Sequence, residues 1–163
     1  ESSIDALVLY AESGVPFEAK GIADVMEVRR MLEGQAVRLA CTRRTADNIR
    51  EITAILEETN KRLSKKQSIE REDEAFHLAI FAATKNDILL RVAISFYELS
   101  RHRRKVYFAD QNRGRQSYED HCTILEAIEE RRVGLAEQQM NAHLSRTVEA
   151  WQSLLGETKV TKR

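Results

Sequence analysis

The chain has 163 residues, of which 42% are hydrophobic and 32% charged, with one proline and six glycines. This composition suits a single, mostly helical domain and argues against a disordered or β-rich chain. The 26 basic residues balance the 26 acidic ones, and few residues are aromatic, so the composition gives no indication of a surface for nucleic acid or an anionic membrane.

No apolar run approaches the roughly 20 residues that span a bilayer, and no signal-peptide pattern is present. Cys41 and Cys122 show no CxxC spacing, which predicts a reducing, cytoplasmic location rather than a disulfide framework. Because the chain begins at Glu1 rather than Met, we expect it to be a fragment or a processed product of a longer protein.

The first half of the chain predicts a short helix and three long ones. An apolar run over residues 4–10 ends at the Gly14-Val15-Pro16 break, since proline disfavours helix at the residue before it. Apolar residues then recur at helical intervals from Ile22 to about Arg44, from 46 to 64 and from 70 to about 83. Thr45 is a suitable N-cap for the second of these long helices.

The second half predicts three more helices. The first, from about 88 to 108, has an inward stripe read as Ile88, Val92, Ser95, Phe96, Leu99 and Val106. Asp110–Gln116 predicts a loop. Ser117 would cap a helix to about Arg131, with Asp120 in its first turn. After a break at 132–134 the last helix runs to about Leu155, and Gly156–Arg163 is expected to fray. Together these segments predict an all-α antiparallel bundle of six to seven helices.

Several polar side chains fall on faces that should be buried. In the segment Glu70–Phe81, Asp73 and His77 lie four residues apart on the apolar face, so they project from adjacent turns in nearly the same direction. His121 and His143 interrupt the apolar stripes of the last two helices. His102, the remaining histidine, lies in the basic run Arg101–Lys105 and is expected to be solvated.

Burying a carboxylate and imidazoles is costly unless something binds them. Each histidine taken alone is most simply a core residue that hydrogen-bonds to a neighbour. Asp73, His77, His121 and His143 together could instead bind one divalent metal, and this ligand set suits zinc, nickel, manganese or iron. Spacing alone leaves both interpretations open.

Arg29 also lies on an apolar stripe, the one formed by Val25, Leu32, Ala36 and Leu39. It could extend to the surface or pair with an internal acid such as Asp73. Alternatively it could face a cavity and form a bidentate pair with an anionic ligand. The residues themselves favour the first interpretation.

Four segments resemble the FCD effector-binding domain, the C-terminal half of FadR-type regulators in the GntR family. They are Asp24–Ala40, Asp73-Glu-Ala-Phe-His77 followed by Asn86, Glu119–Ile128, and Met140-Asn-Ala-His143-Leu144. The resemblance spans about residues 20–155 of a single FCD-like domain at 1–163. Asp120 stands directly before His121, where the family often has Glu. The N-terminal winged helix-turn-helix of such regulators is absent from this chain.

The resemblance implies that Asp73, His77, His121 and His143 bind a divalent metal, zinc first among them, in an internal cavity. It also implies that a small carboxylate or hydroxy acid completes the coordination and that Arg29 receives its carboxylate. We therefore expect the effector-sensing domain of a cytoplasmic, homodimeric transcription regulator that binds DNA through the N-terminal domain. The alternatives are a metal-dependent hydrolase or dioxygenase, or a metal sensor with a structural metal.

Overall fold

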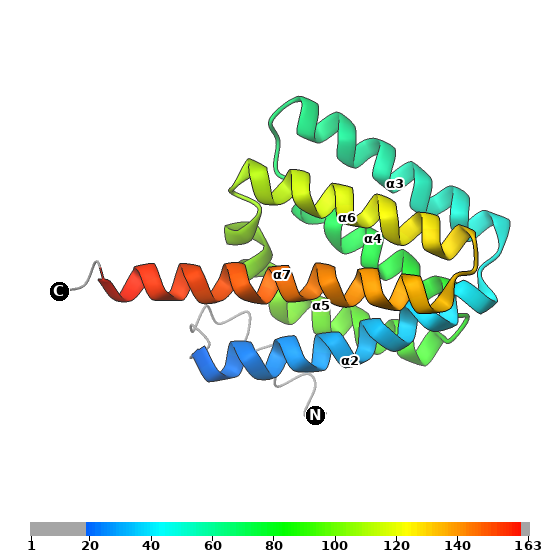
Figure 1. Ribbon diagram of the computed structural model, residues 1–163, viewed down its shortest axis with the longest axis horizontal. Coiled ribbons are helices and arrows are strands. Elements are labelled where there is room, and N and C mark those ends of the chain that lie inside the picture. The colour runs from blue at the N-terminus through cyan, green and yellow to red at the C-terminus, as the bar shows by residue number, and fades with distance from the viewer. Residues whose placement is uncertain (1–18, 161–163) are drawn as a thin grey trace.

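The computed structural model describes residues 19–160, and within this range it contains six helices and no strand. The helices, labelled as in Figure 1, are α2 (Ala19–Arg43), α3 (Ala46–Ser64), α4 (Glu70–Ala83), α5 (Asp87–Tyr107), α6 (Gln111–Glu129) and α7 (Val133–Val160). The short helix predicted at residues 4–10 lies outside the described residues. The predicted all-α bundle is confirmed.

Helix α4 packs against α2, α3 and α5. Helix α7 packs against α2 and α6, and α3 packs against α6. Figure 1 shows α2 and α7 side by side and running in opposite directions. Short connections between consecutive helices explain this antiparallel arrangement.

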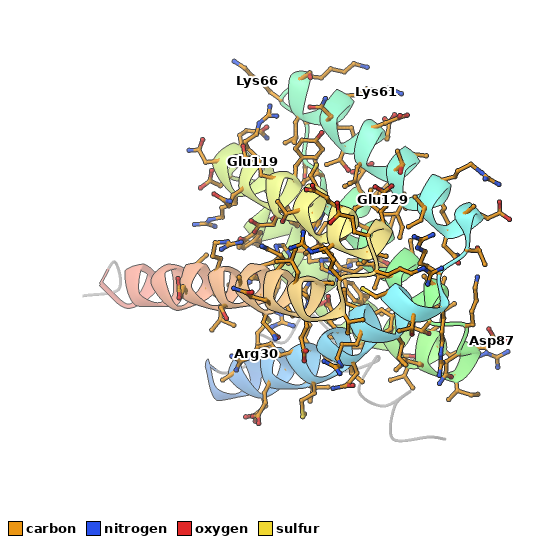
Figure 2. The ribbon with its side chains drawn as sticks, turned by 45° about the vertical axis from the view of Figure 1, so that its right-hand side comes forward. Arg30, Lys61, Lys66, Asp87, Glu119 and Glu129 are labelled. Atoms are coloured by element: carbon orange, nitrogen blue, oxygen red, sulfur yellow. The ribbon has the colours of Figure 1, made fainter. Side chains whose placement is uncertain are left out.

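The apolar face of α4 forms the middle of the core. Ile69, Phe76, Ile80 and Phe81 are each at most 1% exposed, as their helical spacing predicts. Charged side chains such as Arg30 and Lys61 project outward from the bundle (Figure 2). Polar groups buried at the centre are therefore exceptions, and they mark the candidate site.

The connection between α5 and α6 corrects the sequence analysis. Asp110–Gln116 is not a loop: α6 begins at Gln111, and the Asp110 side chain caps it by accepting from the backbone N–H of Asn112. Gly114, which suggested a turn, is a buried helical residue. A Cβ there would lie 3.2 Å from Leu63 Cδ2, so the glycine permits close packing of α6 on the end of α3. Ser117 is buried inside α6 and caps nothing.

The inward face of α5 was also predicted wrongly at several positions, although Phe96 is buried as predicted. The side chain of Leu99 lies outside the described residues. Ile88 is 70% exposed, and Val92 and Val106 are exposed as well. The buried face is instead formed by Ala93, Phe96, Tyr97, Arg104, Tyr107 and Phe108. An apolar stripe could not reveal this face, because part of it consists of polar side chains that surround a cavity.

The last helix is longer than expected, because α7 continues through residues 156–160, which were predicted to fray. None of the described helices combines the length and apolar composition that a membrane span requires. Cys41 and Cys122 are both free thiols.

Candidate metal centre

Three helices bring the four predicted ligand residues together. Asp73 and His77 come from α4, His121 from α6 and His143 from α7, and each is at most 3% exposed. One ligand atom from each residue lies within 4.8 Å of the others. The side chain of His102 lies outside the described part of the chain.

The distances within this cluster suit a metal ion. Oδ1 of Asp73 lies 3.7 Å from Nε2 of His77 and 3.5 Å from Nε2 of His121. The Nε2 atoms of His121 and His143 are 3.4 Å apart. Ligand atoms bonded to one zinc ion at about 2.0–2.1 Å lie roughly 3.0–3.4 Å from one another. These three separations exceed that range by at most a few tenths of an ångström, whereas the widest separation in the cluster, up to 4.8 Å, would have to shorten by more for all four donors to share an ion.

His143 is oriented by a neighbouring carboxylate that the sequence analysis misassigned. Its Nδ1 donates to Oδ2 of Asp120 at 3.1 Å, which leaves Nε2 facing the cluster. Arg146 holds Asp120 through two contacts, from Nε at 3.1 Å and from Nη2 at 2.5 Å. Asp120 lies well inside α6 and is not in its first turn. A carboxylate on the far nitrogen of a histidine is the usual support of a metal ligand.

Glu33 on α2 is a buried acid that the sequence analysis missed. Its Oε1 accepts from Arg29 Nε and from the Tyr97 hydroxyl, each at 2.6 Å. Its Oε2 lies 2.5 Å from Nδ1 of His77, although the ring N–H is not aligned with that oxygen. The carboxylate favours a proton on Nδ1 and so leaves a lone pair on Nε2. The available signal was the spacing, since Glu33 follows Arg29 by four residues on one helix face.

Arg29 is buried, and its acidic partner is Glu33 rather than Asp73. Its Nη2 donates to the Tyr97 hydroxyl and lies 3.1 Å from Nε2 of His77. That imidazole nitrogen has a single lone pair, so it cannot accept from Arg29 and bind a metal at the same time. A metal on His77 would therefore release Nη2 of Arg29 for another acceptor.

The protonation of the cluster suits metal binding. Burial lowers the pKa of His121 well below its usual range, and the neighbouring His143, His77 and Arg29 lower it further. Burial also lowers the pKa of His143, despite its hydrogen bond to Asp120. For Glu33, burial would raise the pKa, but Arg29 and His77 outweigh it and the pKa is lowered. Neutral imidazoles are the form that binds a metal.

A small cavity adjoins the cluster between α2, α5, α6 and α7. Its free volume is about 20 Å³, room for one or two water molecules. Charged, polar and aromatic side chains all contribute to its lining. The lining includes Arg29, Asp73, His143, Arg103, Arg104, Ser117, Thr147, Phe96, Phe108 and Trp151.

Comparison with known proteins places this chain in a family. Residues 24–146 match the FCD domain. The chain is 30% identical over 129 residues to the HTH-type transcriptional regulator LutR of Bacillus subtilis strain 168, covering 76% of this chain and 59% of LutR. It is 26% identical over 144 residues to the repressor NanR of Cronobacter sakazakii, covering 87% of this chain and 55% of NanR. The chain thus spans a little over half the length of these relatives, which are regulators and not enzymes.

Solved structures share the fold. Escherichia coli McbR/YncC superposes with a TM-score of 0.76 at 17% identity, over 85% of this chain and 71% of that one. A GntR-family regulator from Pseudomonas syringae pv. tomato gives a TM-score of 0.69 at 22% identity, over 91% of this chain and 62% of that one. The resemblance carried by the Asp-x-x-Phe-His and Met-x-x-His-Leu segments is confirmed: the chain belongs to the FCD domain family of GntR-type transcription regulators.

Proposed function

We propose that this chain is the effector-sensing domain of a transcription regulator and that Asp73, His77, His121 and His143 bind a divalent metal ion. One observation carries the proposal: four buried donors from three helices converge within 4.8 Å, beside a cavity. Without an ion, this arrangement leaves a carboxylate and imidazoles buried in close contact at a cost. Three nitrogen ligands and one oxygen suit zinc best, with nickel, manganese and iron as alternatives.

The metal would present a small carboxylate or hydroxy-acid effector to Arg29. Arg29 lines the cavity beside Asp73 and His143, and a metal on His77 would release its Nη2. A guanidinium offers planar, paired donors that match a carboxylate. The metal supplies fixed positive charge, while Glu33 holds Arg29 in place by accepting a hydrogen bond from the Nε of Arg29.

Effector binding would change how the helices pack. The free volume of about 20 Å³ is smaller than an organic acid, so an acid can enter only if lining side chains on α2, α5, α6 or α7 move. Its affinity for the opened arrangement would then bias the helix positions. In a cytoplasmic homodimer, this bias would control DNA binding by an N-terminal winged helix-turn-helix domain, as the name HTH-type regulator of the relative LutR suggests.

Metal analysis by mass spectrometry, combined with calorimetry, tests the proposal. The purified chain should contain about one equivalent of metal, and Asp73→Ala and His77→Ala should lose both the metal and the response to small hydroxy acids. A variant that keeps its full metal content would show that its ligand has been misassigned. Arg29→Ala should keep the metal and bind the acid more weakly; equal acid affinity would exclude Arg29 from the effector site.

The small free volume also favours a second candidate, a metal sensor in which the ion itself is the signal. The two candidates differ in their response to organic acids. If chelation unfolds the bundle and no acid changes the melting temperature of the metal-loaded chain, the metal is structural or is the signal.

A further inference from the structure

Arg103 faces the cavity as a cation without an acidic partner among the described residues. Its Nε and Nη1 are buried and make no hydrogen bond within the described part of the chain. The two other guanidinium groups of the cavity have acids: Arg29 pairs with Glu33 at 2.6 Å, and Arg104 pairs with Glu74. Arg103 comes from the basic run Arg101–Lys105 on α5, in which His102 was predicted to be solvated.

The surroundings of Arg103 make this isolation costly. Burial, together with the neighbouring cations Arg29 and Arg104, lowers the pKa of Arg103 to about 10. Arg103 still carries its charge at neutral pH. Arg103 is partly buried, and a charge held away from water without a counter-ion is unfavourable, so an anion from outside the chain would bind it favourably.

The charges around the cavity can be balanced pair by pair. The charges of Arg29 and Glu33 cancel each other, and so do the charges of Arg104 and Glu74. Asp73 carries one negative charge, so a divalent ion bound by it and by neutral imidazoles would keep one net positive charge. Arg103 adds a second. The metal-loaded cavity would therefore hold two uncompensated positive charges, and an effector with a single carboxylate would neutralise only one.

We propose that the effector carries two anionic groups: a carboxylate at the metal and Arg29, and a second acidic group bound by Arg103. This inference rests on the proposed function and narrows the class of effector. The unpartnered Nε and Nη1 of Arg103 are charged donors that suit a carboxylate or a phosphate. The aromatic side chains in the lining, Phe96, Phe108 and Trp151, suit the short carbon chain between the two groups. Lactate-like monoacids would then be weak ligands.

Calorimetry on the zinc-loaded chain with pairs of acids of equal length tests this inference. The pairs are succinate with butyrate and L-malate with 3-hydroxybutyrate. Each diacid should bind about tenfold to a hundredfold more tightly than its monoacid, the range expected for one charge-assisted pair. Phosphoglycolate compared with malonate distinguishes a phosphate from a carboxylate as the second group.

Arg103→Gln should abolish this preference and leave the monoacid affinity unchanged. The matched control is Arg101→Gln, which alters an exposed arginine of the same basic run, paired with Glu98, and should keep the preference. A preference that survives in Arg103→Gln, or monoacids that match diacids in the unmodified chain, would overturn the inference while the proposed function stands. Failure of every acid to bind the zinc-loaded chain would overturn both.

Arg103→Gln also has a readout that needs no ligand. Removing an unpaired buried cation should leave the melting temperature of the ligand-free chain unchanged or higher, and saturating malate should raise the melting temperature of the unmodified chain more than that of the variant. A large fall in melting temperature for ligand-free Arg103→Gln would show that Arg103 stabilises the bundle itself, and would overturn its assignment to the effector.

Discussion

Asp120 and His143 form a hydrogen bond of 3.1 Å that joins α6 to α7 and fixes one imidazole of the candidate metal centre. The bond uses Nδ1 of His143 and leaves Nε2 to face His121. Arg146, one turn further along α7, holds the other side of the carboxylate. A support of this kind sets the tautomer and the direction of a ligand, so its removal should weaken metal binding without removing a ligand.

Asp120→Asn should therefore lower metal affinity by about tenfold to a hundredfold while all four ligands remain. Competition with a chromophoric chelator measures this affinity. Glu119→Gln is the matched control, because Glu119 is the adjacent residue of α6 and points away from the bundle (Figure 2). Equal affinities for the two variants would mean that Asp120 only joins the helices.

Glu33→Gln should destabilise the bundle, because it leaves the Arg29 guanidinium buried without its counter-ion. Removing one partner of a buried ion pair typically costs about 3–5 kcal/mol. Urea unfolding of the metal-free chain gives the free energy. The exposed pair Arg38–Glu137 is the control, and Glu137→Gln should cost at most about 1 kcal/mol.

The double variant Glu33→Gln/Arg29→Met separates charge from packing. Because it removes both charges, it should recover much of the stability lost in Glu33→Gln. A double variant as unstable as the sum of its two single variants would show that the ion pair is not the cause.

The chelated chain should lose stability as the pH falls below about 6.5. His121 and His143 have pKa values lowered by burial, so the folded state resists a proton that the unfolded chain takes up below its ordinary pKa of about 6.5. Above that pH both states hold neutral imidazoles, and the two residues add no pH dependence. Between pH 6.5 and its folded pKa, each of these two histidines lowers the free energy of unfolding by up to about 1.4 kcal/mol for each unit that the pH falls.

Denaturant unfolding between pH 5.5 and 8 measures this effect, since most carboxylates titrate below that window. The slope should become shallower in His121→Gln, which removes one of the two groups. A stability that stays flat down to pH 5.5 in the unmodified chain would show that the histidines are protonated in the folded state.

Residue spacing predicted those parts of this molecule in which apolar periodicity and burial agree. On α4 the apolar residues define the inward face, so Asp73 and His77 stood out within it. On α5, apolar periodicity and burial disagree. The basic residue Arg104 lies inward and Arg103 lines the cavity, whereas the apolar residues Ile88 and Val92 lie outward. A face that surrounds a polar cavity does not follow hydrophobic periodicity, so the inward positions of Arg103 and Arg104 were not predicted.

Contacts between helices were harder to predict than the helices. Glu33 contacts His77 and Tyr97, which lie far from it in the sequence, and these contacts depend on how α2, α4 and α5 pack. The local error at Asp110–Gln116 has a different cause. Gly114 is a strong turn signal, but here it serves the close approach of α6 to Leu63.

Removing the metal should lower the melting temperature of the chain. An ion that binds only the folded state stabilises it by about 2.7 kcal/mol when its free concentration is a hundred times its dissociation constant. For a domain of this size, that corresponds to roughly 5–11 °C. Calorimetry with and without a chelator measures the shift, and zinc added in excess should restore it. Asp73→Asn keeps the shape of the side chain but not its charge, and its melting temperature should respond little to either treatment. A chelator that leaves the unmodified chain unaffected, at a concentration that strips zinc from a reference protein, would contradict metal binding at this cluster.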